Sequence, residues 1–154
     1  SILEATGLPG NRLGLEITES ALMEGGDVRA RLIELRGLGV RLLLDDFGTG
    51  YSSLSYLHRF ELDGLKLDRS FISQLGCDPS GSKLVAASIE MARALDLTVV
   101  AEGVETEQQL ERLRELSCPL AQGYLFARPA PAQELEATLQ RRSPTQVAEQ
   151  ASLA

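Results

Sequence analysis

Short apolar runs alternate along the chain with segments of helical periodicity. The runs are bounded by turn residues and predict strands buried on both faces at 12–18, 40–46, 64–68, 97–102 and 119–126. Apolar residues between them recur at helical spacing, on the faces Val28, Leu32 and Leu35, then Val85, Ile89 and Ala92, then Leu110, Leu113 and Leu116. Because no hairpin signal joins the runs, this order predicts an α/β fold with a parallel sheet and right-handed crossovers, either a barrel or an open sheet.

The two ends of the chain carry weaker signals. Residues 1–7 read as the end of a helix that Gly7 terminates, and Thr106 and Gln109 stand in capping-box spacing before a later helix. Pro131 suits the first turn of a last helix carrying Leu135 and Leu139. We therefore expect one domain over residues 1–142 and a flexible polar tail over 143–154.

Composition narrows the class of protein. A chain of 154 residues with 44% hydrophobic content is typical of a single globular domain. It has no apolar run of about eighteen residues and no signal-peptide pattern, so we expect a cytoplasmic protein with no membrane contact by this segment. A net charge of −7 without clusters of Lys and Arg argues against binding a nucleic-acid polymer. The isolated Cys77 and Cys118 indicate neither a disulfide framework nor a metal site.

Polar side chains follow every predicted strand at its carboxyl end, where active sites form in parallel α/β folds. They are Glu16 and Glu19, Asp45 and Asp46, Lys66 and Asp68, Glu102 and Glu105, and Gln122. Taken singly, each has an ordinary structural explanation as a helix cap, a solvated loop residue or, for the lysine, an edge-strand charge. Neighbouring strand residues face opposite sides, so one of the two aspartates must point inward and needs a cation, a lysine or several N–H donors. Five such contributions at one edge favour a site.

The types of ligand indicate a hard divalent cation. Carboxylates and an amide without histidine suit Mg²⁺ or Mn²⁺ rather than zinc or copper. His58 falls in a short helical pattern and reads as a packing or surface residue, and no serine has a histidine base. Two divalent ions between carboxylates are the usual arrangement for hydrolysing phosphate esters. A barrel enzyme that uses Lys66 as a base toward a carbon acid stays as an alternative.

Five motifs in order and spacing resemble one family. "LEITES", "DDFGTGYSSLSYL", "LKLDRSFI", "VVAEGVET" and "QGYLFARP", within residues 8–131, are similar to those of EAL-type cyclic di-GMP phosphodiesterases of bacterial signalling. The resemblance implies a modified TIM-type (β/α)8 barrel. It also implies a hydrolase that opens one phosphodiester of cyclic di-GMP, with a divalent metal, to give linear pGpG.

The resemblance also implies roles for individual residues. Metal ligands would be Glu16, Asp45, Asp46 and Glu102, with Asp46 as the bridge between two ions. Lys66 would hold the attacking water or stabilise the phosphoryl charge, and Glu102 would also accept the proton of the water.

A second group of residues would support this site. Substrate contacts and the polar surround would come from Asp68, Arg69, Gln122 and Glu105. Glu19 would anchor the loop 47–54, whose Gly48, Thr49 and Gly50 allow a tight turn beside the metals. In the family this loop connects the metal site to a dimer contact, so the resemblance implies a homodimer.

The chain departs from the family at its front. The Glu-Ala-Leu signature, with its metal-ligand glutamate, and the asparagine ligand of the next strand are absent, since "LEA" at 3–5 directly precedes the Glu16 strand. A complete barrel has eight strands. We therefore expect the C-terminal part of an EAL domain, with five to six strands and weak or no activity by itself. A cyclic di-GMP-binding or regulatory module that does not cut is the alternative, and the resemblance implies an upstream regulatory domain.

Overall fold

Five parallel strands form one sheet in the order β1-β2-β3-β4-β5. The computed structural model describes residues 2–23, 27–48, 57, 60–76 and 79–135. The strands are β1 Gly14–Thr18, β2 Arg41–Phe47, β3 Gly64–Leu67, β4 Thr98–Glu102 and β5 Leu120–Gln122. All five predicted strands are confirmed. The fifth was predicted too long, because the chain turns away from the sheet after Gln122.

Helices lie between the strands, and one helix and a 3₁₀ turn precede β1. They are α1 Ile2–Thr6, α2 Glu19–Met23, α3 Val28–Gly37, α5 Arg69–Ile72, α6 Pro79–Ala94 and α7 Glu107–Glu115, with a 3₁₀ turn at Gly10–Arg12. The predicted capping box is present: the Thr106 hydroxyl accepts from the Gln109 N–H, and the Gln109 side chain accepts from the Thr106 N–H. A helical turn follows Pro131, whereas Leu139 and the predicted tail lie outside the described residues. Among the described helices, none combines the length and apolar character needed to cross a bilayer.

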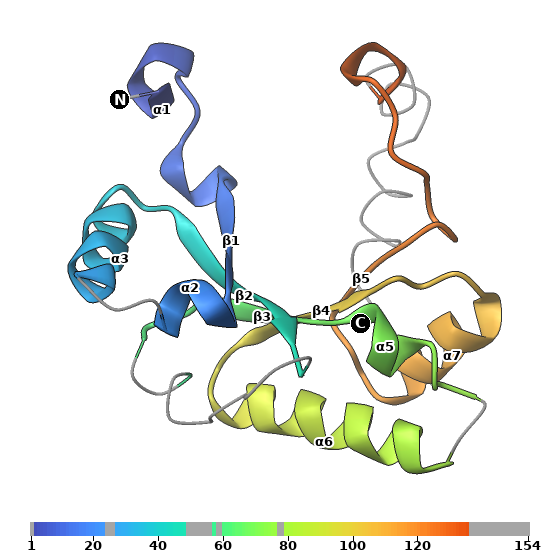
Figure 1. Cartoon of the computed structure of the whole chain (residues 1–154). Helices are drawn as coiled ribbons and strands as arrows, with labels where there is room; N and C mark the ends of the chain where they lie inside the picture. Colours follow the sequence, from blue (N-terminus) through green and yellow to red (C-terminus); the bar gives the residue numbers. More distant parts are fainter. Residues whose placement is uncertain (1, 24–26, 49–56, 58–59, 77–78, 136–154) are drawn as a thin grey trace.

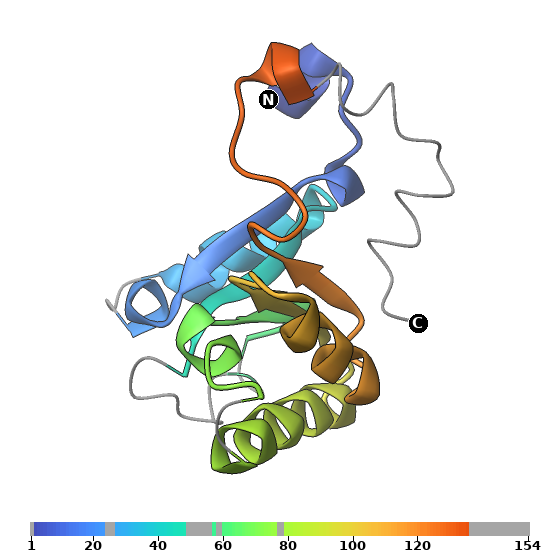
Figure 2. The ribbon, with the colours of Figure 1, turned by 90° about the vertical axis from the view of Figure 1, so that its right-hand side faces the viewer.

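The hydrophobic core lies between the sheet and its helices. Figures 1 and 2 show α6 and α7 on the same face of the sheet. The predicted helical faces supply buried side chains there: Leu32, Val85, Ile89, Ala92, Leu110 and Leu113. On β4 the buried Val99 and Ala101 alternate with Val100 and Glu102, so Val100 and Glu102 face away from these helices. The helical face of the sheet is therefore apolar, and the opposite face carries the polar side chains.

Strand β2 is irregular near its carboxyl end. Leu42 and Leu44 are buried, but the next buried side chain is Phe47, so the alternation shifts by one residue. The register with β3 slips between Leu44 and Phe47, and Asp46 has a left-handed φ of 55°. These features describe a β-bulge, which aims neighbouring side chains away from strict alternation.

Candidate active site

The side chain of Lys66 lies at the centre of a group of carboxylates. This residue of β3 is buried, with 5% of its surface exposed. Its Nζ lies 2.7 Å from Glu16 Oε2 on β1, 3.0 Å from Asp45 Oδ1 on β2 and 2.7 Å from Glu102 Oε1 on β4. Because parallel strands end at one edge of the sheet, residues far apart in sequence converge here. The structure thus brings together four of the predicted site residues.

These neighbours set the charge states of the site. Burial alone would lower the pKa of Lys66, but hydrogen bonds to Glu102, Glu16 and Asp45 raise it above its ordinary value. The ammonium is therefore charged at neutral pH. Burial raises the pKa of Glu102, and the hydrogen bond from Lys66 offsets only part of that effect. Glu102 is thus a stronger base than an exposed glutamate.

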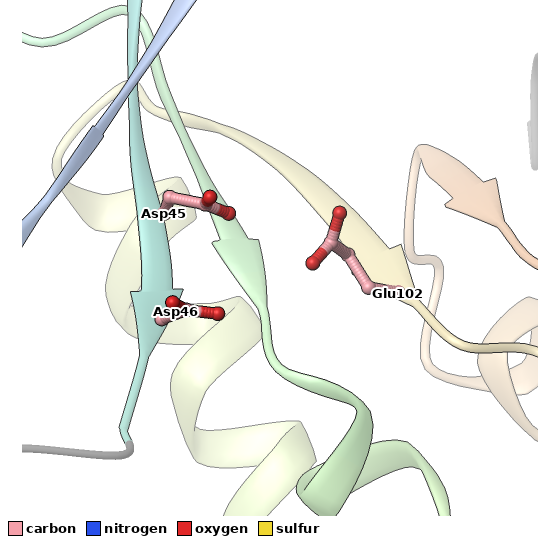
Figure 3. A group of neighbouring side chains, drawn as sticks. All are labelled: Asp45, Asp46 and Glu102. Carbon is pink, nitrogen blue, oxygen red and sulfur yellow. The ribbon is translucent and has the colours of Figure 1, made fainter.

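A second group of carboxylates overlaps the first. Oxygen atoms of Asp45, Asp46 and Glu102 lie within 4.8 Å of one another. Figure 3 shows Asp45 and Asp46 at the end of β2, and Glu102 at the end of β4, with their carboxylates facing one another. Strict alternation would send only one of the two aspartates to this side, whereas the bulge at Asp46 brings both.

This arrangement fits a divalent cation. Glu16, Asp45, Asp46 and Glu102 contribute four negative charges, and Lys66 contributes one positive charge. Asp45 Oδ1 is buried and receives no well-aligned hydrogen bond within the described part of the chain, although it lies 3.0 Å from the ammonium. The ammonium is its one close partner there, and a bound divalent cation would further offset the cost of burying this carboxylate oxygen. Oxygen ligands of this kind suit Mg²⁺, Mn²⁺ or Ca²⁺.

Glu16 differs from the other predicted ligands. It is paired with Lys66, its side chain is 50% exposed, and the mutually close carboxylates do not include it. Its role as a metal ligand stays a prediction.

The predicted substrate residues lie beyond this group. Asp68 caps α5, since its Oδ1 accepts from the Ser70 N–H at 2.9 Å. Hydrogen bonds from the Ser70 side chain and from this N–H lower the pKa of Asp68. Arg69 pairs with Glu105 through Nη2 and Oε1 at 2.9 Å. Gln122 ends β5, where its carbonyl accepts from the Val104 N–H at 3.1 Å.

The predicted loop is described in part. Glu19 is the first residue of α2, and Gly48 follows β2 with a φ of 97°, as expected for a tight turn. Thr49 and Gly50 lie outside the described residues, as does His58.

Two features that hold the loop after β4 were not predicted from the sequence. Gln109 was identified only as a cap, but its Oε1 also accepts from the Glu105 N–H at 2.8 Å, and its Nε2 donates to the Ile72 carbonyl at 3.3 Å. A Cβ at Gly123 would overlap the backbone of Val104, so only glycine fits there. The single sequence signal for this contact is the glycine after Gln122.

Comparison with known proteins identifies the family. The EAL domain model matches residues 1–129. The cyclic di-GMP phosphodiesterase NbdA of Pseudomonas aeruginosa is 56% identical over 135 residues, which cover 87% of this chain and 17% of NbdA.

Two solved structures have similar folds. The EAL domain of Mycobacterium smegmatis DcpA has a TM-score of 0.85 and 42% identity, over 93% of this chain and 65% of that one. The manganese and cyclic di-GMP complex of Klebsiella pneumoniae BlrP1 has a TM-score of 0.78 and 37% identity, over 83% of this chain and 33% of that one. The chain spans less than two thirds of each relative.

The predicted fold class is confirmed by these matches. The five parallel strands and their helices form a portion of a TIM-like α/β barrel. On the match over residues 1–129 and the identity to NbdA, the chain belongs to the EAL domain family.

Proposed function

We propose that this chain carries the reaction site of a metal-dependent phosphodiesterase that hydrolyses cyclic di-GMP to linear pGpG. The observation that carries the proposal is the buried Lys66 between carboxylates of three strands, with Asp46 beside them. The 56% identity to a cyclic di-GMP phosphodiesterase supports the choice of substrate.

The residues suit divalent cations, Mg²⁺ or Mn²⁺, two of which the family resemblance implies for the complete domain. Asp45, Asp46 and Glu102 would hold them, and Glu16 would join as a fourth ligand. When bound, such ions polarise the phosphodiester and lower the pKa of the attacking water. BlrP1 in complex with manganese and cyclic di-GMP is consistent with this choice.

Lys66 and Glu102 have complementary roles in the proposed reaction. The Lys66 ammonium stabilises the negative charge that develops on a phosphoryl oxygen, and its raised pKa keeps it protonated. Glu102 accepts a proton from the attacking water, a role that its raised pKa favours.

Polar residues around the rim would position the dinucleotide. Arg69 and Glu105 form an exposed ion pair, and the Arg69 guanidinium can also reach a phosphate or base of a bound ligand. Asp68 and Gln122 complete this polar surround. The family resemblance further leads us to expect a cytoplasmic homodimer whose contact includes the loop 47–54.

The test is hydrolysis of cyclic di-GMP by the chain with Mn²⁺ or Mg²⁺, with pGpG separated by chromatography. We expect slow but metal-dependent pGpG formation, and an increase when the chain is extended to include a Glu-Ala-Leu strand. Asp46→Asn should slow the reaction about 100-fold. Asp27→Asn is the matched control, because Asp27 makes no capping hydrogen bond.

Binding of cyclic di-GMP without pGpG formation by either form of the chain would refute hydrolysis. That result would favour the regulatory module instead.

A further inference from the structure

Two glycines follow the site carboxylates at corresponding places. Gly48 comes two residues after Asp46 and has a φ of 97°, and Gly103 comes directly after Glu102 and has a φ of 71°. Both values lie in the left-handed region, where glycine is favoured. The chain therefore turns sharply after each of the two strands, β2 and β4, that supply the carboxylates.

Helix α5 fills the space beside both glycines. A Cβ at Gly48 would overlap Cε2 and Cζ of the Phe71 ring. A Cβ at Gly103 would lie 2.5 Å from Cγ and 2.7 Å from Cβ of Arg69. The ring and the aliphatic part of Arg69 thus lie directly against the backbone of the two turns, with no room for a side chain on either glycine.

The helix itself is fixed at both ends. Asp68 caps its start through the Ser70 N–H. Near its end, the Ile72 carbonyl accepts from Gln109 Nε2 at 3.3 Å, and the Ile72 side chain is fully buried. Lys66 lies just upstream on β3, so one short segment carries both the ammonium and the groups that contact the two turns.

We propose that α5 is a spacer that sets the distance between the carboxylates at the end of β2, Asp45 and Asp46, and Glu102 at the end of β4. Phe71 and Arg69 are then positioning residues for the cation site. The inference rests on the proposed function, because it assigns these residues to the metal site of that reaction. The exposed ion pair of Arg69 with Glu105 is separate from the packing of its aliphatic part on Gly103.

The test is calorimetric titration of the chain and its variants with Mn²⁺ alone, with folding checked by circular dichroism. Phe71→Ala and Arg69→Ala should each weaken Mn²⁺ binding about tenfold. Arg69→Lys should retain the affinity, because lysine keeps the Cβ and Cγ that contact Gly103. Leu75→Ala is the control for lost packing. Leu75 is buried and follows α5, but its side chain is not among the nearest neighbours of a Cβ at Gly48 or Gly103.

A double substitution tests the contact itself. Gly48→Ala should weaken Mn²⁺ binding, and Phe71→Ala added to it should recover part of the loss, because the new methyl group then has space. Losses that simply add would overturn the proposal, as would unchanged affinity in Phe71→Ala and Arg69→Ala. If the unmodified chain bound no Mn²⁺, the same variants would be titrated in the chain extended by a Glu-Ala-Leu strand, and no effect of Phe71→Ala and Arg69→Ala there, or no Mn²⁺ binding at all, would overturn this inference. Formation of pGpG by the extended chain decides the proposed function separately.

Discussion

Replacing Lys66 by methionine isolates the part that its ammonium plays in the metal-free site. The substitution keeps an unbranched side chain of similar length and removes the positive charge. Glu102 and Asp45 are mostly buried, with 20% and 22% of their side chains exposed. Without the ammonium their like charges repel one another at close range, so the folded state should lose stability.

The size of this loss follows from the geometry. Opposite unit charges 2.7 Å apart attract by about 6 kcal/mol at an effective dielectric constant of 20. Burial of Lys66 offsets part of this attraction, and removing one partner of a buried ion pair typically costs about 3–5 kcal/mol. For a domain of this size, that loss lowers the Tm by about 6–20 °C.

The assay is thermal unfolding followed by circular dichroism in EDTA at pH 7. Lys83→Met is the control, because Lys83 is the other lysine of the chain and is exposed on α6. That control should shift stability by less than about 0.5 kcal/mol. Mn²⁺ should raise the Tm of Lys66→Met more than that of the unmodified chain, because the ion no longer competes with an ammonium. Equal Tm values for the two lysine variants in EDTA would refute the reasoning.

Three further predictions concern Glu102, two glycines and a thiol. Burial raises the pKa of Glu102 above 4.5, so the stability it contributes is fully present below that pH and is lost as the pH rises through the folded-state pKa. Glu102→Gln should therefore lose less stability than the unmodified chain between pH 4.5 and pH 7 in urea unfolding with EDTA, and an equal loss would contradict this. Gly123→Ala should destabilise by about 1–3 kcal/mol, because its methyl group would overlap the loop after β4. Gly37→Ala places its methyl group in open space and should be neutral or stabilising by up to about 1 kcal/mol. Similar changes of stability in Gly123→Ala and Gly37→Ala would contradict the close contact of Gly123 with Val104. Burial raises the pKa of the Cys118 thiol to about 11, and in a Cys77→Ser background iodoacetamide at pH 8 should label it at least about 1,000-fold more slowly than in urea. Rapid labelling of the folded chain would show that the thiol is accessible.

The strands and the composition of the site could be predicted because both depend on local patterns. Apolar runs of strand length identify β1 to β5, and the carboxyl ends of parallel strands share one edge. That rule alone places Lys66 near the carboxylates of other strands. The rule could not predict the 2.7 Å contacts of Lys66 Nζ with Glu16 and Glu102, because these depend on the register between strands.

The bulge and the short helices could not be predicted from the same patterns. Alternation assigns Asp45 and Asp46 to opposite sides, and only the left-handed φ of Asp46 brings both to the rim. Helix α5 has four residues, too few to show a helical period. The contact of Phe71 with Gly48 therefore has no sequence signal beyond the glycine itself.

The irregular end of β2 has a consequence for moving this site into another protein. A regular strand grafted with two adjacent aspartates would direct one of them toward the helices, whatever metal was supplied. A transplant must therefore carry the backbone of Asp45 to Gly48, including its two left-handed residues, and not the carboxylates alone. The host strand must also shift its alternation of inward and outward side chains by one residue, so that the residue corresponding to Phe47 still reaches the core. The unit that can be transferred is the backbone conformation of this segment, because that conformation determines where the acidic side chains point.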